Sequence, residues 1–143
     1  MTSEFRAKQS RDLTYGLQKE VKIKPLFEKH FGIKFAKLDK YNTFDFSSVD
    51  KKILIELKSR RVDKNQYPST MVGYNKIKKA VQNLAQGREV YFTFAFKDYI
   101  CYYKFEEVNK SWIRDGGRCD RGKQEIKPYY YIPTEELKEF DIY

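Results

Sequence analysis

The segment Ile53–Lys58, with the sequence ILIELK, constrains the fold of this chain more than any other stretch. Its apolar residues predict a buried strand, and side chains along a strand alternate between the two faces of a sheet. Glu56 and Lys58 therefore share one face, while Ile55 lies on the other. Ten residues separate Glu56 from Asp45, which lies in a second extended run, residues 43–46. Two carboxylates and a lysine that converge at strand ends can hold a hard divalent cation and activate a water, which suggests metal-assisted phosphodiester hydrolysis.

The charge of the whole chain indicates the kind of partner. The chain has 143 residues, which fits a single domain over residues 1–143, and its formal net charge is +9. Such an excess favours polyanions, with nucleic acid before an anionic membrane surface, although a lysine-rich surface can also serve solubility alone. No apolar run approaches the length of a membrane span, and the first residues lack an apolar signal region. We therefore expect no membrane partner and a cytoplasmic or nuclear-type intracellular location, not a secreted protein.

The chain is poor in the residues that zinc sites and catalytic triads require. His30 is the only histidine, and Cys101 and Cys119 are the only cysteines. A closed zinc site needs about four such ligands, and a serine or cysteine protease needs a histidine base. We expect Cys101, which alternates with tyrosines, to lie in the core.

Hydrophobic spacing predicts an alternation of helices and strands. A helix is expected over residues 11–23, and Pro25 then either kinks it or begins a second short helix that ends before Gly32. A three-strand meander and a polar loop over residues 60–69 follow, and the clearest helix covers residues 73–86. The remaining expected elements are an aromatic hairpin (90–96 and 99–105), an exposed basic loop (109–124), a last strand (126–132) and a short helix (135–138).

An acid followed two residues later by lysine occurs five times, so its context has to select among the copies. The copies that begin at Glu20 and Glu136 lie in helical patterns, and the copy at Asp50 lies in a turn. Glu125 follows a loop rich in Gly and Arg. Only Glu56 lies on an apolar strand and follows a strand-borne Asp at short range, so we select it.

The order helix, meander, motif, helix, strand resembles the PD-(D/E)XK nuclease superfamily over roughly residues 10–105. The resemblance implies an α/β fold in which helices flank a mixed central sheet, with an α-β-β-β-α-β core. By the same resemblance Asp45, Glu56 and Lys58 correspond to the Asp, the second acid and the lysine of the motif. Glu20 corresponds to a further acid that many members carry on the first helix. One departure is Phe44, since the family often has Pro before its Asp.

The resemblance also implies a different role for each of these residues. Asp45, Glu56 and the Leu57 carbonyl would hold Mg²⁺, for which Mn²⁺ could substitute, and Glu20 would bind through water or help to hold a second ion. Lys58 would position the attacking water or stabilise charge on the phosphate. We expect the nucleic acid to contact residues on the strand, loop and helix that follow, namely Arg60, Arg61, Tyr67, Tyr74 and Lys76.

The sequence thus predicts a magnesium-dependent deoxyribonuclease, and it leaves open whether the enzyme is an endonuclease, an exonuclease or a junction resolvase. Superfamily members of this size often form homodimers, although the sequence indicates no interface. One alternative is a nucleic-acid-binding module that kept the fold without the activity. Another is a small interaction protein whose charge serves only solubility or membrane contact.

Overall fold

The computed structural model describes residues 19–116 and 127–140, without the side chains of residues 19–22. The helix expected over residues 11–23 therefore lies largely outside the described residues, as does much of the loop expected over residues 109–124. Within the described residues, no helix is both long enough and apolar enough to cross a membrane.

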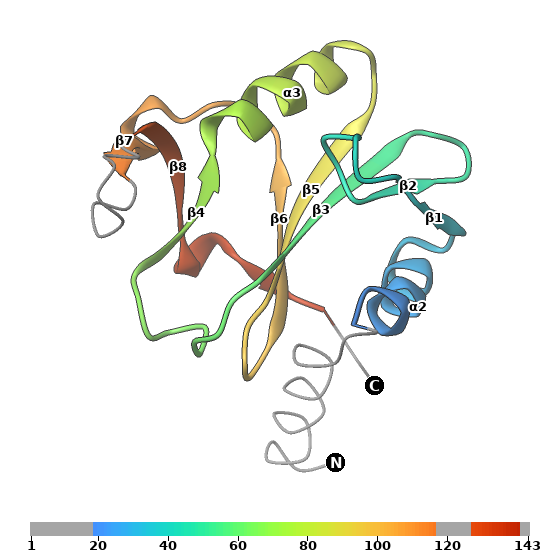
Figure 1. Cartoon of the computed structure of the whole chain (residues 1–143), viewed down its shortest axis with the longest axis horizontal. Helices are drawn as coiled ribbons and strands as arrows, with labels where there is room; N and C mark the ends of the chain where they lie inside the picture. The colour runs from blue at the N-terminus through green and yellow to red at the C-terminus, as the bar shows by residue number, and fades with distance from the viewer. Residues whose placement is uncertain (1–18, 117–126, 141–143) are drawn as a thin grey trace.

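A six-stranded mixed sheet forms the centre of the described structure (Figure 1). Its strands are β1 (Phe35–Lys37), β2 (Phe46–Ser48), β3 (Ile53–Ser59), β5 (Glu89–Ala95), β6 (Ile100–Phe105) and β9 (Lys138–Glu139). Their order in the sheet is β1-β2-β3-β5-β6-β9. The first three strands form the predicted antiparallel meander, β3 runs parallel to β5, and β5 and β6 form the predicted hairpin. Together with the flanking helices, this arrangement confirms the predicted α/β fold.

One helix covers each face of the central sheet. Helix α2 (Lys19–Phe31) buries Ile23 and Phe27 in a cluster with residues of β1, β2 and β3. Helix α3 (Tyr74–Ala85) buries Ile77 and Ala80 against the opposite face. The helices lie well apart in Figure 1, with α3 above the sheet and α2 to its right. Strand β5 is buried on both faces by this arrangement, which explains why its residues after Glu89 are apolar except for Thr93.

Helix α2 passes through Pro25 without breaking into two helices. A proline inside a helix removes one backbone donor, but the apolar contacts of Ile23 and Phe27 on either side of Pro25 hold the helix together. The helix ends as predicted at Gly32, which adopts a φ of 69° and donates its N–H to the Glu28 carbonyl at 2.9 Å.

A second sheet corrects two of the predictions. It contains β4 (Ser69–Gly73), β8 (Lys127–Pro133) and β7 (Ile113–Gly116), in the order β4-β8-β7. Strand β4 falls where a loop was expected to lead into the helix, and β7 falls within the expected basic loop. Both strands are short and pair with β8, which is distant from β4 in the sequence, so local patterning gave little sign of them.

The second sheet packs its inner face into the core beneath α3. Val72, Tyr130 and Ile132 are buried in the same cluster as Ile77. The short helix expected over residues 135–138 is instead a 3₁₀ turn (Thr134–Glu136), and β9 begins after Leu137. A further 3₁₀ turn (Lys110–Trp112) leads into β7.

Candidate active site

Glu56 lies nearly buried between two lysines on the α3 face of β3. Its side chain is only 4% exposed, whereas its neighbour Ile55 is buried on the α2 face, as strand alternation predicts. Lys58 Nζ lies 3.5 Å from Glu56 Oε1, and Lys76 Nζ lies 3.1 Å from Glu56 Oε2. Lys58 comes from the same strand and Lys76 from the first turn of α3, so two separate elements hold this carboxylate.

Burial raises the pKa of Glu56 above its ordinary value, and the nearby Asp45 carboxylate raises it further. The attraction of Lys76 and Lys58 opposes both effects, without cancelling them. Among the described side chains, Glu56 Oε2 is a buried oxygen whose one close polar neighbour is the Lys76 ammonium, at 3.1 Å, and no other group donates a hydrogen bond to it. The site therefore contains a buried carboxylate oxygen whose bonding capacity is unfilled.

Asp45 lies immediately before β2, not within a strand as its sequence pattern suggested. Its backbone still bridges two neighbouring strands: its N–H donates to the Ile55 carbonyl at 2.9 Å, and its carbonyl accepts from Leu38 N–H at 2.8 Å. Its carboxylate accepts a hydrogen bond from Leu57 N–H at 2.7 Å, which places it beside the residue that follows Glu56. The structure thus brings Asp45, Glu56 and Lys58 together.

Two further residues belong to the same site. Lys76 donates a short hydrogen bond to the Thr43 carbonyl, so it connects α3 to the segment that carries Asp45. Thr93, buried on β5, donates from its hydroxyl to the Glu56 carbonyl at 2.8 Å and fixes the backbone of β3. The sequence pattern suggested Lys76 only as a nucleic-acid contact and gave no sign of Thr93. The one sequence feature that could have indicated a place for Lys76 in the site is its position beside the apolar face of α3.

The oxygen atoms of the site suit a hard divalent cation. Asp45 and Glu56 supply carboxylates, the donors that Mg²⁺ prefers, and Glu56 Oε2 has capacity for a ligand. No group of three or more His, Cys, Asp or Glu that could hold a metal occurs among the described residues. Glu20 falls on the backbone of α2, but its side chain lies outside the description, so its role stays a prediction. The role of the Leu57 carbonyl also stays a prediction.

The predicted nucleic-acid contacts fall into two places. Arg60 and Arg61 line a pocket of about 280 Å³ together with Tyr67, which is 56% exposed. Tyr74 and Lys76 lie instead on the first turn of α3. The structure therefore offers two separate surfaces on which these predicted contacts could be tested.

Arg60 is half-buried and has bonds within the protein. Its Nε donates to Thr70 Oγ1 at 3.1 Å, and its guanidinium also donates to the Met71 carbonyl at 2.6 Å. Burial lowers the pKa of Arg60. These bonds join the end of β3 to β4, so Arg60 has a structural task beside any contact with a ligand.

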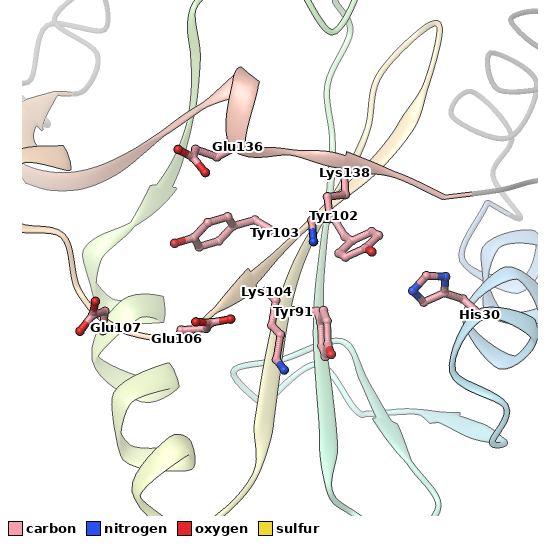
Figure 2. A pocket seen from close by; sticks show the side chains of 9 residues that line it. All are labelled: His30, Tyr91, Tyr102, Tyr103, Lys104, Glu106, Glu107, Glu136 and Lys138. Carbon is pink, nitrogen blue, oxygen red and sulfur yellow. The ribbon is translucent and has the colours of Figure 1, made fainter.

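A separate pocket of about 400 Å³ lies along β6, where β9 pairs only with Cys101 and Tyr102. Figure 2 shows Glu106, Glu107 and Glu136 gathered on one side of it. None of the predicted site residues lines this pocket. Its lining combines these three carboxylates with Lys104 and Lys138, so it lacks the positive excess of the chain as a whole. We call it the acidic pocket and use it below as a comparison surface.

The mixed sheet between two helices, with Asp45 before β2 and the Glu56–Lys58 motif on β3, defines the PD-(D/E)XK nuclease superfamily. The model of a family described as "Phage putative PDDEXK endonuclease" matches residues 7–140. The chain belongs to this family, so the nuclease assignment holds at the level of the family. No curated protein matches the chain.

Proposed function

We propose that the protein is a divalent-metal-dependent nuclease that hydrolyses phosphodiester bonds in DNA. The observation that carries the proposal is Glu56, an almost buried carboxylate next to Asp45 with a lysine on each side. Membership of a nuclease family and the net charge of +9 support the choice of a polyanionic substrate.

Each side chain of the site has a task in this reaction. Asp45 and Glu56 would hold Mg²⁺, with Mn²⁺ as a substitute, through their carboxylate oxygens. When bound, such an ion polarises the scissile phosphate and lowers the pKa of the attacking water. The Lys58 side chain is 38% exposed, so its ammonium can reach a phosphate and stabilise the negative charge that develops there.

The hydrolysis itself adds one water across one ester bond. The water oxygen forms a new bond to phosphorus, the bond from phosphorus to the leaving oxygen breaks, and the leaving oxygen takes up a proton. The positive charge of Lys76 stabilises a negatively charged group next to Glu56. Its hydrogen bond to the Thr43 carbonyl holds the segment before Asp45 against α3.

One observation favours a second candidate, a nucleic-acid-binding module without activity. Lys58 and Lys76 both form ion pairs with Glu56, so side chains of the protein itself offset the charge of this carboxylate. Such a module would still bind DNA through its excess positive charge. The DNA affinity of such a module would not depend on Asp45.

A side-by-side measurement of cleavage and DNA affinity separates the two candidates. Substrates should be linear, circular, single-stranded and branched DNA, each with Mg²⁺, Mn²⁺ or EDTA. Asp45→Asn should abolish cleavage, since it removes a ligand charge while Asn can still accept from Leu57 N–H. Lys58→Ala should also stop turnover, and both variants should keep their affinity for DNA.

The matched control is Glu136→Gln, which alters another acid-x-lysine sequence at an exposed position. It should cleave like the unaltered protein. If Asp45→Asn cleaves normally while Glu136→Gln does not, the site has been misassigned. If the unaltered protein cleaves nothing with either metal, the binding module is the better description.

A further inference from the structure

Three tyrosines, one at the start of α3 and two on β8, each have a cation over the ring. Arg114 lies over Tyr131, with its guanidinium carbon 4.2 Å from the ring centroid. Lys127 Nζ lies 5.8 Å from the ring centroid of Tyr129. On α3, Lys78 Nζ lies 5.6 Å from the ring centroid of Tyr74. We call Tyr74, Tyr129 and Tyr131 the tyrosine strip.

Two members of the strip lie on the outer face of the β4-β8-β7 sheet. Along β8, Tyr130 and Ile132 are buried in the core, so the alternating residues Tyr129 and Tyr131 point the other way. Tyr131 pairs with Met71, which is 40% exposed. This face is therefore not covered by another layer of the described structure.

The strip is continuous with the candidate active site through the chain and through strand pairing. Tyr129 pairs directly with Gly73, and Tyr74 is the next residue along the chain. Two residues further on, Lys76 forms its ion pair with Glu56. Tyr74 therefore precedes Lys76 by two residues on α3, and Tyr129 lies across from Gly73, the residue just before Tyr74.

Gly116 allows both rings of β8 to lie across β7. A Cβ atom at Gly116 would collide with the hydroxyl of Tyr131 and would lie 3.3 Å from Cδ2 of Tyr129. Beside Tyr131 and Arg114 is a pocket of about 520 Å³, whose lining includes one acid, Glu135. Both rings thus lie against Gly116 of β7, and the Tyr131 ring borders a hollow large enough to accept a base.

We propose that the tyrosine strip is a binding surface for single-stranded nucleic acid, which extends the DNA path of the proposed function away from the cleavage site. Aromatic faces stack on unpaired bases of any sequence, and nearby Arg and Lys side chains neutralise the phosphates. The cations now lie over the tyrosine rings, and each could turn to a phosphate when a base takes its place. The proposal rests on the proposed function, since the strip begins at the proposed cleavage site.

The chemistry favours a single strand over a duplex. The bases of a duplex stack on one another, so their faces are closed to tyrosine side chains, whereas unpaired bases leave both faces available. A duplex would use only the cations of the strip. The contribution of the tyrosine rings to affinity therefore distinguishes a single strand from a duplex.

The test is fluorescence anisotropy in EDTA, where metal-dependent cleavage is blocked. The probes are a labelled oligothymidylate of about 12 nucleotides, within the usual range of single-strand sites, and a duplex of equal length. The double change Tyr129→Leu with Tyr131→Leu should weaken single-strand binding by roughly tenfold or more, because two stacking faces are lost. The matched change of both residues to Phe keeps the rings and should keep the affinity.

Charge is tested in the same assay. Arg114→Ala should lower the magnitude of the slope of log affinity against log salt by about 0.7, the value for one single-strand phosphate contact. Lys138→Ala, at the acidic pocket of Figure 2, is the control and should leave the slope unchanged.

The outcomes separate this inference from the proposed function. If the Leu variant binds the single strand as tightly as the unaltered protein, or loses duplex binding equally, the strip is not a single-strand surface. A loss that is as large with Phe as with Leu would also overturn it, because stacking would then not be the cause. Cleavage of DNA by the unaltered protein bears only on the proposed function, so each can fail alone.

Discussion

At the scale of single residues, the most unusual feature is the buried charge of Glu56. Its two lysine partners come from different elements, β3 and α3, and burial still raises its pKa. Removing one partner from a buried ion pair leaves an uncompensated charge, which usually costs more than the pair contributes. The site therefore links the stability of the fold to the groups that carry the proposed chemistry.

Lys76→Met should lower the free energy of unfolding at neutral pH by about 1–3 kcal/mol, because Glu56 would keep Lys58 as its one ion-pair partner. Denaturant titration measures this loss. The matched control is Lys79→Met, an exposed lysine on the same helix, which should change stability by less than about 0.5 kcal/mol. If both variants lost the same free energy of unfolding, the ion pair between Lys76 and Glu56 would contribute nothing to stability.

Glu56 should also make stability depend on pH in a definite direction. Because its pKa is raised in the fold, the native state binds a proton more readily than the unfolded chain between the two pKa values. Stability from this group therefore falls as pH rises across that interval. Glu56→Gln lacks this titration, so the stability of the unaltered protein relative to Glu56→Gln should decrease as pH rises above about 4.5. A difference that stays constant between acid and neutral pH would contradict the raised pKa.

At the scale of elements, the central sheet carries Glu56 and Lys58, whereas α3 and the β4-β8-β7 sheet position Lys76 and the tyrosine strip. Helix α3 carries Lys76 to Glu56 at its first turn, while Ile77 and Ala80 anchor the helix in the core. Strand β4 leads into this helix and pairs with β8, which places Tyr129 next to the helix start. The second sheet thus fixes the direction in which α3 begins.

Strand β6 gives a prediction about cysteine chemistry. Cys101 is buried as predicted, and burial raises the pKa of its thiol to about 12. In a Cys119→Ser protein, Cys101 should not react with a thiol reagent at pH 8 while folded, and should react fully in denaturant. Since the unfolded thiol ionises near its ordinary value of 9.0, this group should also lower stability as pH rises from 9.0 towards about 12. Rapid reaction of the native protein would mean that β6 opens readily.

At the scale of the whole molecule, we expect the net charge of +9 to govern the proposed association with DNA. Binding to a duplex in EDTA should weaken steeply with salt, because each neutralised phosphate releases counterions. Arg61→Ala, at an exposed position beside the pocket that Tyr67 lines, should lower the magnitude of the salt slope by about 0.9. Lys138→Ala, at the acidic pocket, should leave the slope unchanged. Equal effects at both positions would mean that the binding is spread over the whole surface.

The parts of the fold that the sequence predicted are those with strong local patterns. The bounds of β3, the bulk of α3 and the β5–β6 hairpin followed from periodicity, since each of these elements has at least six residues. Strands β4 and β7 were not predicted because they are short, and their pairing with β8 is not visible in local sequence. Asp45 was expected within a strand, but it lies just before one.

For the site, the sequence by itself determined that Glu56 and Lys58 share a face of one strand and that an aspartate precedes them at short range. Alternation along a strand is a local property, so it can be read from order alone. Only the tertiary structure decided that Lys76 contacts Glu56, that Leu57 N–H holds Asp45, and that Gly73 pairs with Tyr129. These contacts join segments that meet only when the sheets and α3 pack, because burial of the core, not local preference, brings them together.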